Sequence, residues 1–333
     1  MIDRFDWLFL QQIPRTMENI KYLEITSELG AGTRGASLGI DAMRVASWKT
    51  GSSILTKYPL EIVANHNELL WTPVTTKNGK YIAGIAKVYQ NIADATEKTL
   101  KKGDFPVILA GDHSTAGGTI AGIKAAYPNK RLGIVWVDAH ADLHTPHTTP
   151  SGNVHGMPLA TALGTDNIEK AINEIKDETK VAWETMKNLG GICPKILPED
   201  LVFVAVRDTE DPENYLMDKL QIRNFTVAEV NNKGPKEIGE QVLKLLEPCD
   251  MIYISFDVDS MDCDLVSNGT GTPVKNGLSP EQTGELLETL VADEKIIAFE
   301  IVEVNPCLDN KCNTMAEVAL ERLIQVVHIL ENK

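Results

Sequence analysis

Residues 132–142 read Leu-Gly-Ile-Val-Trp-Val-Asp-Ala-His-Ala-Asp, and this stretch decides how the rest of the chain is organised. Leu132 to Val137 is an unbroken apolar run, typical of a strand that is buried on both faces. In extended backbone, residues two apart share a face, so Asp138, His140 and Asp142 are expected to project together. Carboxylates and an imidazole, without a nearby thiolate, favour a hard or borderline divalent cation over a structural zinc site. The stretch therefore predicts half of a metal site at the end of a strand.

The same arrangement recurs twice, which favours a metal site over the solvated loop that a single motif would fit equally well. Residues 107–111 form an apolar run that ends in Asp112-His113-Ser114, and residues 251–256 form another that ends in Asp257-Val258-Asp259. Ligands of open parallel sheets bind at the carboxyl ends of strands, so three such ends can converge. Two His and four Asp are more ligands than one ion needs, which indicates two ions bridged by carboxylates and a hydroxide.

Apolar runs and helical segments alternate along most of the 333 residues. This alternation predicts an α/β fold, a three-layer α/β/α sandwich with a mostly parallel, roughly eight-stranded sheet. We expect one domain over 1–333, with 1–20 as an N-terminal extension that contains a leading helix. The predicted strands are 22–26, 60–64, 107–111, 132–137, 201–206, 225–230, 251–256 and 296–302. The predicted helices after the leading one are 41–49, 81–102, 115–126, 157–163, 168–189, 236–246, 279–291 and 314–330, with 115–126 expected to pack closely against the sheet.

Composition restricts the partners that the protein can have. The formal net charge is −15 and no Lys/Arg cluster offsets it, which disfavours a nucleic-acid partner and suits a cationic small molecule. Five cysteines, an odd number, do not form a disulfide framework and indicate reduced thiols in the cytoplasm. The apolar run Trp7 to Leu10 is far too short for a signal sequence or a membrane span. We expect a cytoplasmic protein that binds neither nucleic acid nor membrane.

Four spaced blocks resemble the signature motifs of the ureohydrolase family, which includes arginase, agmatinase and formiminoglutamase. The blocks are Gly111-Asp112-His113-Ser114, Asp138-Ala139-His140-Ala141-Asp142, Ser255-Phe256-Asp257-Val258-Asp259 and Glu303-Val304-Asn305-Pro306. The segment Ser151-Gly152-Asn153-Val154-His155-Gly156 resembles the arginase branch in particular. The resemblance extends from about Gly30 to the carboxyl terminus, and several blocks in the right order are far more specific than one.

The resemblance implies an arginase-like fold and hydrolysis of L-arginine to L-ornithine and urea. It implies two Mn²⁺ per subunit, although cobalt, nickel or iron would tolerate the same residues. The metal ligands that it implies are His113, Asp138, His140, Asp142, Asp257 and Asp259. A hydroxide between the ions would attack the guanidinium carbon, because two cations that share a water lower its pKa. Asp142 would align that hydroxide, His155 would carry a proton to the departing amine, and Glu303 would pair with the guanidinium.

The resemblance also implies which residues bind the rest of the substrate. Ser151 and Asn153 would bind the α-carboxylate, together with His144, which stands where the arginase pattern has an asparagine. The acidic run after Val206 would bind the α-amino group. The candidates in that run are Asp208, Glu210, Asp211 and Glu213; Glu213 matches best, and the choice between Glu210 and Asp211 stays open. Thr272 matches a threonine near the guanidinium. The family further implies a homo-oligomer, a trimer or a hexamer.

Departures from the family pattern keep other substrates and functions open. Besides His144, the loop 262–268 is about one residue longer than usual, and 165–198 resembles a helical insertion. The first alternative is an agmatinase or another guanidino-compound ureohydrolase, which Ser151, Asn153 and the acidic run disfavour. The second is a catalytically silent, metal-bound regulatory protein, which the presence of all six ligands disfavours. A phosphoesterase is a third, and a net-negative pocket would repel its substrate.

Overall fold

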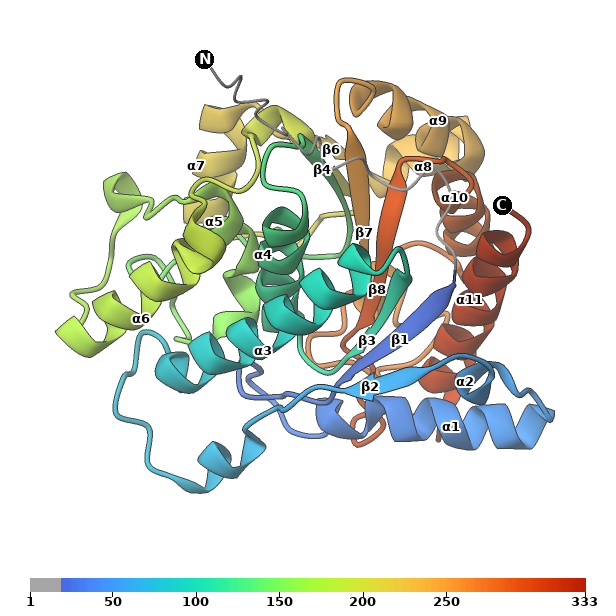
Figure 1. The fold of residues 1–333 in the computed structure, drawn as a ribbon, viewed down its shortest axis with the longest axis horizontal. Coiled ribbons are helices and arrows are strands. Elements are labelled where there is room, and N and C mark those ends of the chain that lie inside the picture. Colours follow the sequence, from blue (N-terminus) through green and yellow to red (C-terminus); the bar gives the residue numbers. More distant parts are fainter. Residues whose placement is uncertain (1–18) are drawn as a thin grey trace, which may run out of the picture.

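A computed structural model describes residues 19–333 and shows one sheet with helices on both of its faces (Figure 1). The sheet has eight strands in the order β2-β1-β3-β8-β7-β4-β5-β6, and every pair of neighbours is parallel. The strands are β1 (Ile20–Ile25), β2 (Leu60–Ile62), β3 (Phe105–Ala110), β4 (Leu132–Val137), β5 (Leu201–Val204), β6 (Arg223–Phe225), β7 (Met251–Asp257) and β8 (Ile296–Val302). The predicted three-layer α/β/α sandwich is confirmed, with a sheet that is parallel throughout.

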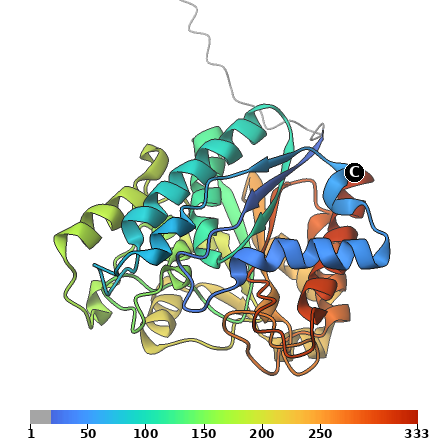
Figure 2. The same ribbon diagram turned by 90° about the horizontal axis from the view of Figure 1, so that it is seen from below.

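The helices form one layer on each face of the sheet. Figure 2 shows α3 and α6 on one side of the strands and α1 and α11 on the other. The first layer contains α3 (Ile82–Lys101), α4 (Ala116–Ala126), α5 (Pro158–Leu163), α6 (Asp177–Lys187) and α7 (Asp211–Leu220). The second contains α1 (Gly39–Thr50), α2 (Ile54–Lys57), α8 (Val227–Lys233), α9 (Pro235–Leu245), α10 (Pro280–Val291) and α11 (Thr314–Glu331).

The apolar runs of the central strands are explained by burial on both faces. In β4, Ile134 and Trp136 pack into the core under the first layer, while Val135 and Val137 pack into the core under the second. Because neighbouring side chains point to opposite faces, both sets must be apolar where both faces are covered. The strand order places β3, β8, β7 and β4 side by side in the middle of the sheet. The carboxyl ends of these four strands therefore lie together.

Two of the predicted elements are wrong over part of their length. Residues 225–230 were expected to be a strand, but β6 ends at Phe225 and Thr226 caps α8. The Oγ1 of Thr226 accepts from the Glu229 backbone N–H, and the Glu229 carboxylate accepts from the Thr226 N–H, 3.1 Å away. This reciprocal pair stabilises a helix start in spite of the β-branched residues.

Residues 168–189 were expected to be helical throughout, yet 171–176 are not helical and α6 begins only at Asp177. The backbone explains the difference, because the N–H groups of Ile172 and Asn173 both donate to the His147 carbonyl, at 2.9 and 3.0 Å, and not to a carbonyl four residues before them. The Asn173 Nδ2 donates to the carbonyls of Pro146 and Thr149 at 3.1 and 2.7 Å. They also fasten this stretch to the loop after β4. That 165–198 is an insertion stays a prediction.

No element was predicted in the acidic run after Val206, and α7 begins inside it, at Asp211. The leading helix and all but the last two residues of the predicted extension 1–20 lie outside the described residues; Ile20 already belongs to β1.

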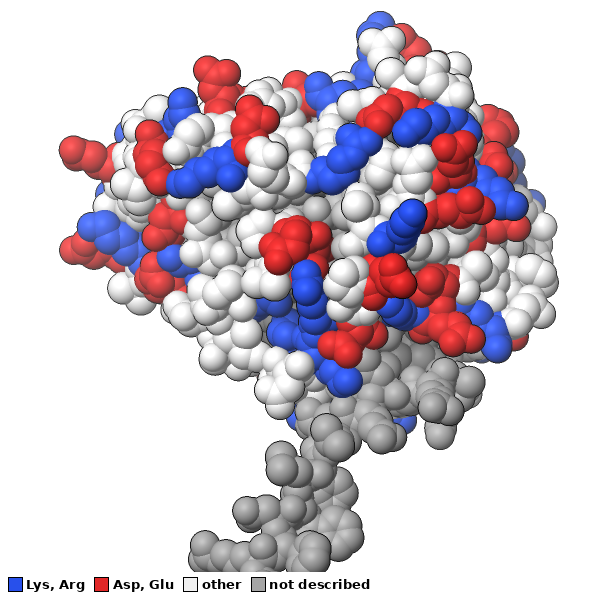
Figure 3. All heavy atoms as spheres, turned by 90° about the horizontal axis from the view of Figure 1, so that it is seen from above, with Lys and Arg blue, Asp and Glu red and all other residues white. Residues whose placement is uncertain are grey.

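The described surface gives no sign of a nucleic-acid site on the face drawn in Figure 3. There, Lys and Arg side chains are interspersed with Asp and Glu, so residues 19–333 form no extended basic patch on that face. In the same part of the chain, no helix combines the length and the apolar character needed to cross a membrane.

Glycines allow α3 and α4 to approach closely. A Cβ built on Gly118 would lie 3.0 Å from the Tyr89 backbone, and one on Gly122 would lie 2.6 Å from the Ala93 carbonyl oxygen. The small residues of α4 thus allow close packing against the neighbouring helix as well as against the sheet.

We expect Gly122→Ala to destabilise the protein by roughly 1–3 kcal/mol, because the new methyl group collides with backbone that cannot move aside. The collision outweighs the helix propensity of alanine, which alone favours the change by about 1 kcal/mol. Gly84→Ala in α3 is the matched control: its Cβ would meet the flexible end of the Leu69 side chain. Urea unfolding of both variants measures the difference, and equal stabilities would contradict the packing described here.

Candidate metal centre

The six predicted metal ligands lie together at the carboxyl ends of three central strands. His113 follows β3, Asp138, His140 and Asp142 follow β4, and Asp257 and Asp259 end β7 and begin the turn beyond it. Five of them are buried and His140 is half-buried. Parallel strands with both faces covered bring these positions to one place, although they are up to 146 residues apart in the sequence.

One local structure is repeated at the ends of all three strands. The side chains of Asp112, Asp138 and Asp257 each accept a hydrogen bond from the backbone N–H two residues further on, at 2.9, 2.7 and 2.8 Å. An aspartate that binds the backbone in this way folds the chain into a tight turn. The turn places the side chain at the third position, His140 or Asp259, beside the first aspartate. The repeated motif is thus a turn as well as a set of ligands.

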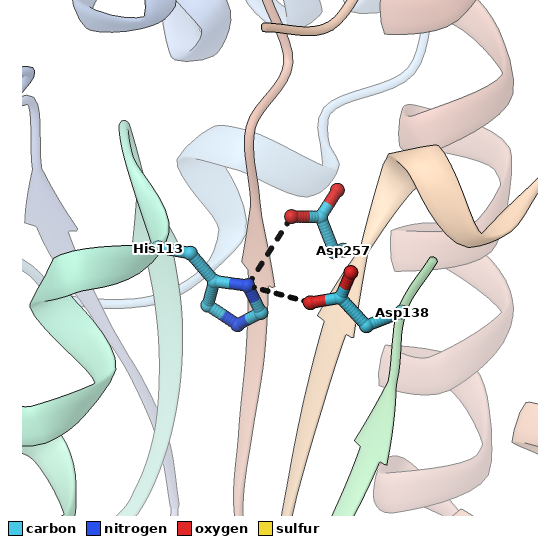
Figure 4. Close-up of side chains that lie close together, drawn as sticks. All are labelled: His113, Asp138 and Asp257. Atoms are coloured by element: carbon cyan, nitrogen blue, oxygen red, sulfur yellow. Dashed lines mark ion pairs between the residues drawn. The ribbon is translucent and has the colours of Figure 1, made fainter. Parts of the chain in front are cut away.

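The ligand atoms form two clusters that share Asp138. One contains His113, Asp138 and Asp257, and the other contains Asp138, His140 and Asp259; within each, the candidate ligand atoms all lie within 4.8 Å of one another. Figure 4 shows the first, with the His113 ring pointing at both carboxylates. The His113 Nδ1 lies 2.9 Å from Asp138 and 3.2 Å from Asp257. Two sites with a shared carboxylate are what a bridged pair of ions requires.

The spacing of these side chains suits a bound cation better than hydrogen bonds between them. Buried polar atoms normally have hydrogen-bond partners, yet His113 Nδ1 and Asp138 Oδ2 have none in spite of their short separation. They approach closely without the alignment of a hydrogen bond. Ligands of an octahedral cation, each about 2.1 Å from it, lie about 3 Å from their neighbours. The distances in the first cluster match that spacing, and Asp142 adds an oxygen 3.3 Å from His113 Nδ1.

The electrostatics of the cluster also call for cations. Burial and the neighbouring aspartates raise the pKa of Asp142, Asp257 and Asp259 above the ordinary value. Burial lowers the pKa of the His113 and His140 imidazoles, but the surrounding carboxylates outweigh it and raise both values well above the ordinary one. Without metal, protons therefore balance the buried charge. Divalent cations would replace those protons, so metal binding should release them.

Sequence reasoning missed a supporting shell behind the ligands. The Ser255 hydroxyl lies 2.8 Å from His113 Nε2, and the Trp136 ring stacks on the His113 ring at 4.0 Å. Such contacts fix the orientation of a ligating imidazole. Ser255 and Trp136 precede Asp257 and Asp138 by two positions, so the period of the strand was the signal that could have identified them.

A cavity of about 250 Å³ opens above the clusters. The predicted residues that line it are His113, His140, Asp142, His144, Ser151, Asn153, His155, Asp208, Glu210, Glu213, Asp257 and Thr272. Thr149, Pro150 and Gly156 line it as well and were not predicted. Asp211 is not among the lining residues; it is exposed at the first position of α7, whereas Glu210 lines the cavity. The geometry therefore favours Glu210 over Asp211.

The remaining predicted residues occupy defined positions around this cavity. Glu303 is buried, with its Oε1 2.8 Å from the His113 backbone N–H that donates to it and 3.4 Å from His155 Nδ1. The Thr272 hydroxyl donates to Asp259 at 3.2 Å. Glu303 and Thr272 each contact a member of the metal clusters, so each can orient a ligand as well as meet a substrate.

His144 faces acidic side chains. Its Nε2 lies 3.1 Å from Glu210 and 3.5 Å from Glu213, the acids predicted to bind the α-amino group, and its Nδ1 lies 3.1 Å from the Thr148 hydroxyl. Asp208 lies 3.6 Å from His140 Nε2. The acidic run thus forms one wall of the cavity, and His144 lies against that wall.

Comparisons with known proteins agree with this geometry. The sequence model of the Arginase family matches residues 23–328. An arginase of Bacillus subtilis is 33% identical over 307 residues, which cover 91% of this chain and 96% of that one. The solved structure of the Bacillus caldovelox arginase has a TM-score of 0.77 at 31% identity and covers 93% of this chain and 98% of its own. An Entamoeba histolytica arginase solved in complex with L-ornithine has a TM-score of 0.76 at 26% identity, covering 96% and 100%.

We expect chelation of divalent ions to lower the melting temperature, and added Mn²⁺ to restore it, because cations offset the buried carboxylates. At 100 times the dissociation constant the ion would stabilise the fold by about 2.7 kcal/mol. The raised pKa values of His113 and His140 favour the metal-free fold at low pH, and that contribution is lost as the pH rises. The gain from Mn²⁺ should therefore grow as the pH rises above about 6.5, the ordinary pKa of an imidazole.

Thermal unfolding with EDTA and then with excess Mn²⁺ measures this gain. Asp138→Asn should lose most of it, since both clusters share that carboxylate. Asp264→Asn, an exposed acid paired with Lys275, is the matched control and should respond as the unmodified chain does. A melting temperature that is indifferent to both reagents would argue against a metal centre.

Proposed function

The chain belongs to the arginase family, and on that premise we propose that it hydrolyses L-arginine to L-ornithine and urea. One observation carries the proposal: two ligand clusters that share Asp138 lie at a cavity that Glu210 and Glu213 also line. The clusters suit hydrolysis of a guanidinium group. The acidic wall suits a substrate with a second cationic group, as an α-amino acid has.

Metal binding is assigned to the two clusters together with Asp142. When bound, two cations lower the pKa of a water molecule that they share and supply hydroxide at neutral pH. The oxygen-rich ligand set, four carboxylates and two imidazoles, supports manganese. The chain itself supplies ligand orientation through Ser255 and Trp136 behind His113.

Glu303 and His155 act on the guanidinium end of the substrate. The Glu303 carboxylate is assigned to the guanidinium group; it is buried and accepts from the His113 backbone N–H beside the metal clusters. Burial lowers the pKa of His155, but the Glu303 carboxylate 3.4 Å away outweighs it and raises the pKa above the ordinary value. The neighbouring carboxylate thus favours the protonated imidazole. The imidazole can give its proton to the amine that departs when the C–N bond breaks.

The amino-acid end of the substrate would lie between the loop after β4 and the start of α7. Ser151 and Asn153, in the loop after β4, are assigned to the α-carboxylate. Glu213 and Glu210 are assigned to the α-amino group, with Asp208 beside them. Burial raises the pKa of Glu213, and a substrate ammonium group would offset that cost. Thr272, which lines the cavity and donates to Asp259, is assigned to the guanidinium end.

We further propose that the protein is a cytoplasmic homo-oligomer, a trimer or a hexamer. The five cysteines are free in the structure, which supports a reducing compartment. The exposed Val45 and Trp48 on α1 and the exposed Trp71 are large apolar side chains of the kind found at subunit interfaces. Their exposure supports an association of subunits.

Urea release by Mn²⁺-loaded protein, offered L-arginine and agmatine side by side, tests the proposal. We expect turnover of arginine. Asp259→Ala should lower kcat roughly 100-fold or more, because it removes a ligand of the second cluster and a metal supplies several kcal/mol of catalysis. Asp264→Ala removes an exposed carboxylate that pairs with Lys275 and is not a proposed ligand, so this variant should keep full activity.

Two outcomes would overturn parts of the proposal. Turnover of agmatine alone would keep the metal centre and reject the assignments of Ser151, Asn153 and the acidic wall. No urea from either substrate, with Mn²⁺ still stabilising the fold, would favour a metal-bound regulatory protein over an enzyme.

A further inference from the structure

We propose that Lys80 is a positioning residue for the substrate α-carboxylate, which it controls by fixing the orientation of the Asn153 side chain. The Lys80 ammonium donates to Asn153 Oδ1 at 2.9 Å, and Asn153 lines the cavity. This inference rests on the proposed function and deepens it. In this proposal, a lysine outside the signature motifs makes the protein prefer a substrate that carries a carboxylate.

The chemistry of the amide explains why a lysine matters here. An asparagine side chain has an accepting end, Oδ1, and a donating end, Nδ2, and only Nδ2 can bind a carboxylate. An ammonium group donates and never accepts, so Lys80 can hold only the Oδ1 end. With Oδ1 held by Lys80, Nδ2 is the end left for the substrate. Without Lys80 the amide can turn and present an acceptor to the carboxylate, which repels it.

The charges around the cavity strengthen the argument. Three acidic residues that are not predicted metal ligands line it, namely Asp208, Glu210 and Glu213, and the lining drawn from residues 19–333 includes neither Lys nor Arg. These acids attract the amino group of arginine but repel its carboxylate. Lys80 places a positive charge one hydrogen bond behind the lining. A substrate without a carboxylate, such as agmatine, gains nothing from that charge.

Lys80 is held in place by its own backbone. Its N–H donates to the Gly152 carbonyl at 2.8 Å. This bond fastens the segment before α3 to the loop that carries Ser151 and Asn153. Gly152 has a φ of +77°, and a Cβ there would lie 1.8 Å from the Lys77 carbonyl oxygen. The two segments are therefore in direct backbone contact. Lys80 is half-buried, and its backbone is held in place while its ammonium group contacts Asn153.

A pair of inhibitors that differ in the carboxylate tests the inference. L-Ornithine has the carboxylate, and 1,4-diaminobutane is the same diamine without it. We expect Lys80→Met to raise the inhibition constant of ornithine and the KM of arginine about tenfold or more, and to leave kcat and the inhibition constant of diaminobutane within about twofold. Lys80→Arg keeps a cationic donor and should restore most of the loss. Lys87→Met, at an exposed position on α3, is the matched control.

A double-mutant cycle with Asn153→Ala tests the route through Asn153. If Lys80 acts by orienting that amide, Lys80→Met should have little further effect on ornithine once Asn153 is alanine. Additive effects would overturn the inference, and so would equal losses for ornithine and diaminobutane or no loss for ornithine. Wild-type urea release in the same assay tests the proposed function separately. If it is absent, calorimetric binding of ornithine and diaminobutane to the Mn²⁺-loaded variants still tests Lys80.

Discussion

Four aspartates and two histidines crowded at one end of a parallel sheet form the constraint on which the rest of the structure depends. Like charges this close in a buried place repel one another unless protons or cations balance them. The raised pKa values of Asp142, Asp257 and Asp259 express that repulsion. The fold holds the groups together because each aspartate turn is anchored to a strand whose two faces are covered by helices. The energy of the apolar core thus maintains an arrangement whose repulsion protons or bound cations must offset.

The strand order turns this constraint into a site with two distinct ends. The predicted metal ligands follow β3, β4 and β7, and Glu303 follows β8, which lies between β3 and β7. The proposed guanidinium end of the cavity is therefore built on the middle of the sheet. The proposed amino-acid end is built on the loop after β4 and the start of α7, and this loop is fastened to the segment around Asn173 and, through Gly152, to Lys80. In the proposed account, the sheet determines the reaction, and this loop and the start of α7 determine the substrate.

The sequence predicted the parts of this structure that depend on local pattern. Apolar runs that end in aspartate located the central strands, because burial on both faces requires such runs. The spacing of two residues identified Asp138, His140 and Asp142 as side chains on one face. Prediction failed where a tertiary contact or a cap decided the outcome. The Thr226–Glu229 capping box starts a helix where part of a strand was expected. The hydrogen bonds of Asn173 hold a segment that was expected to be helical against the loop after β4. Lys80 and Ser255 were missed because their contacts join segments 73 and 142 residues apart.

Anomalous X-ray diffraction from crystals grown with Mn²⁺ tests the central claim most directly, because it locates each ion without assuming any activity. The account predicts two peaks per chain, one among His113, Asp138 and Asp257 and the other among Asp138, His140 and Asp259, with Asp138 contacting both. A single peak, or none at these side chains, would contradict a binuclear centre and, with it, the hydrolytic mechanism proposed for this protein.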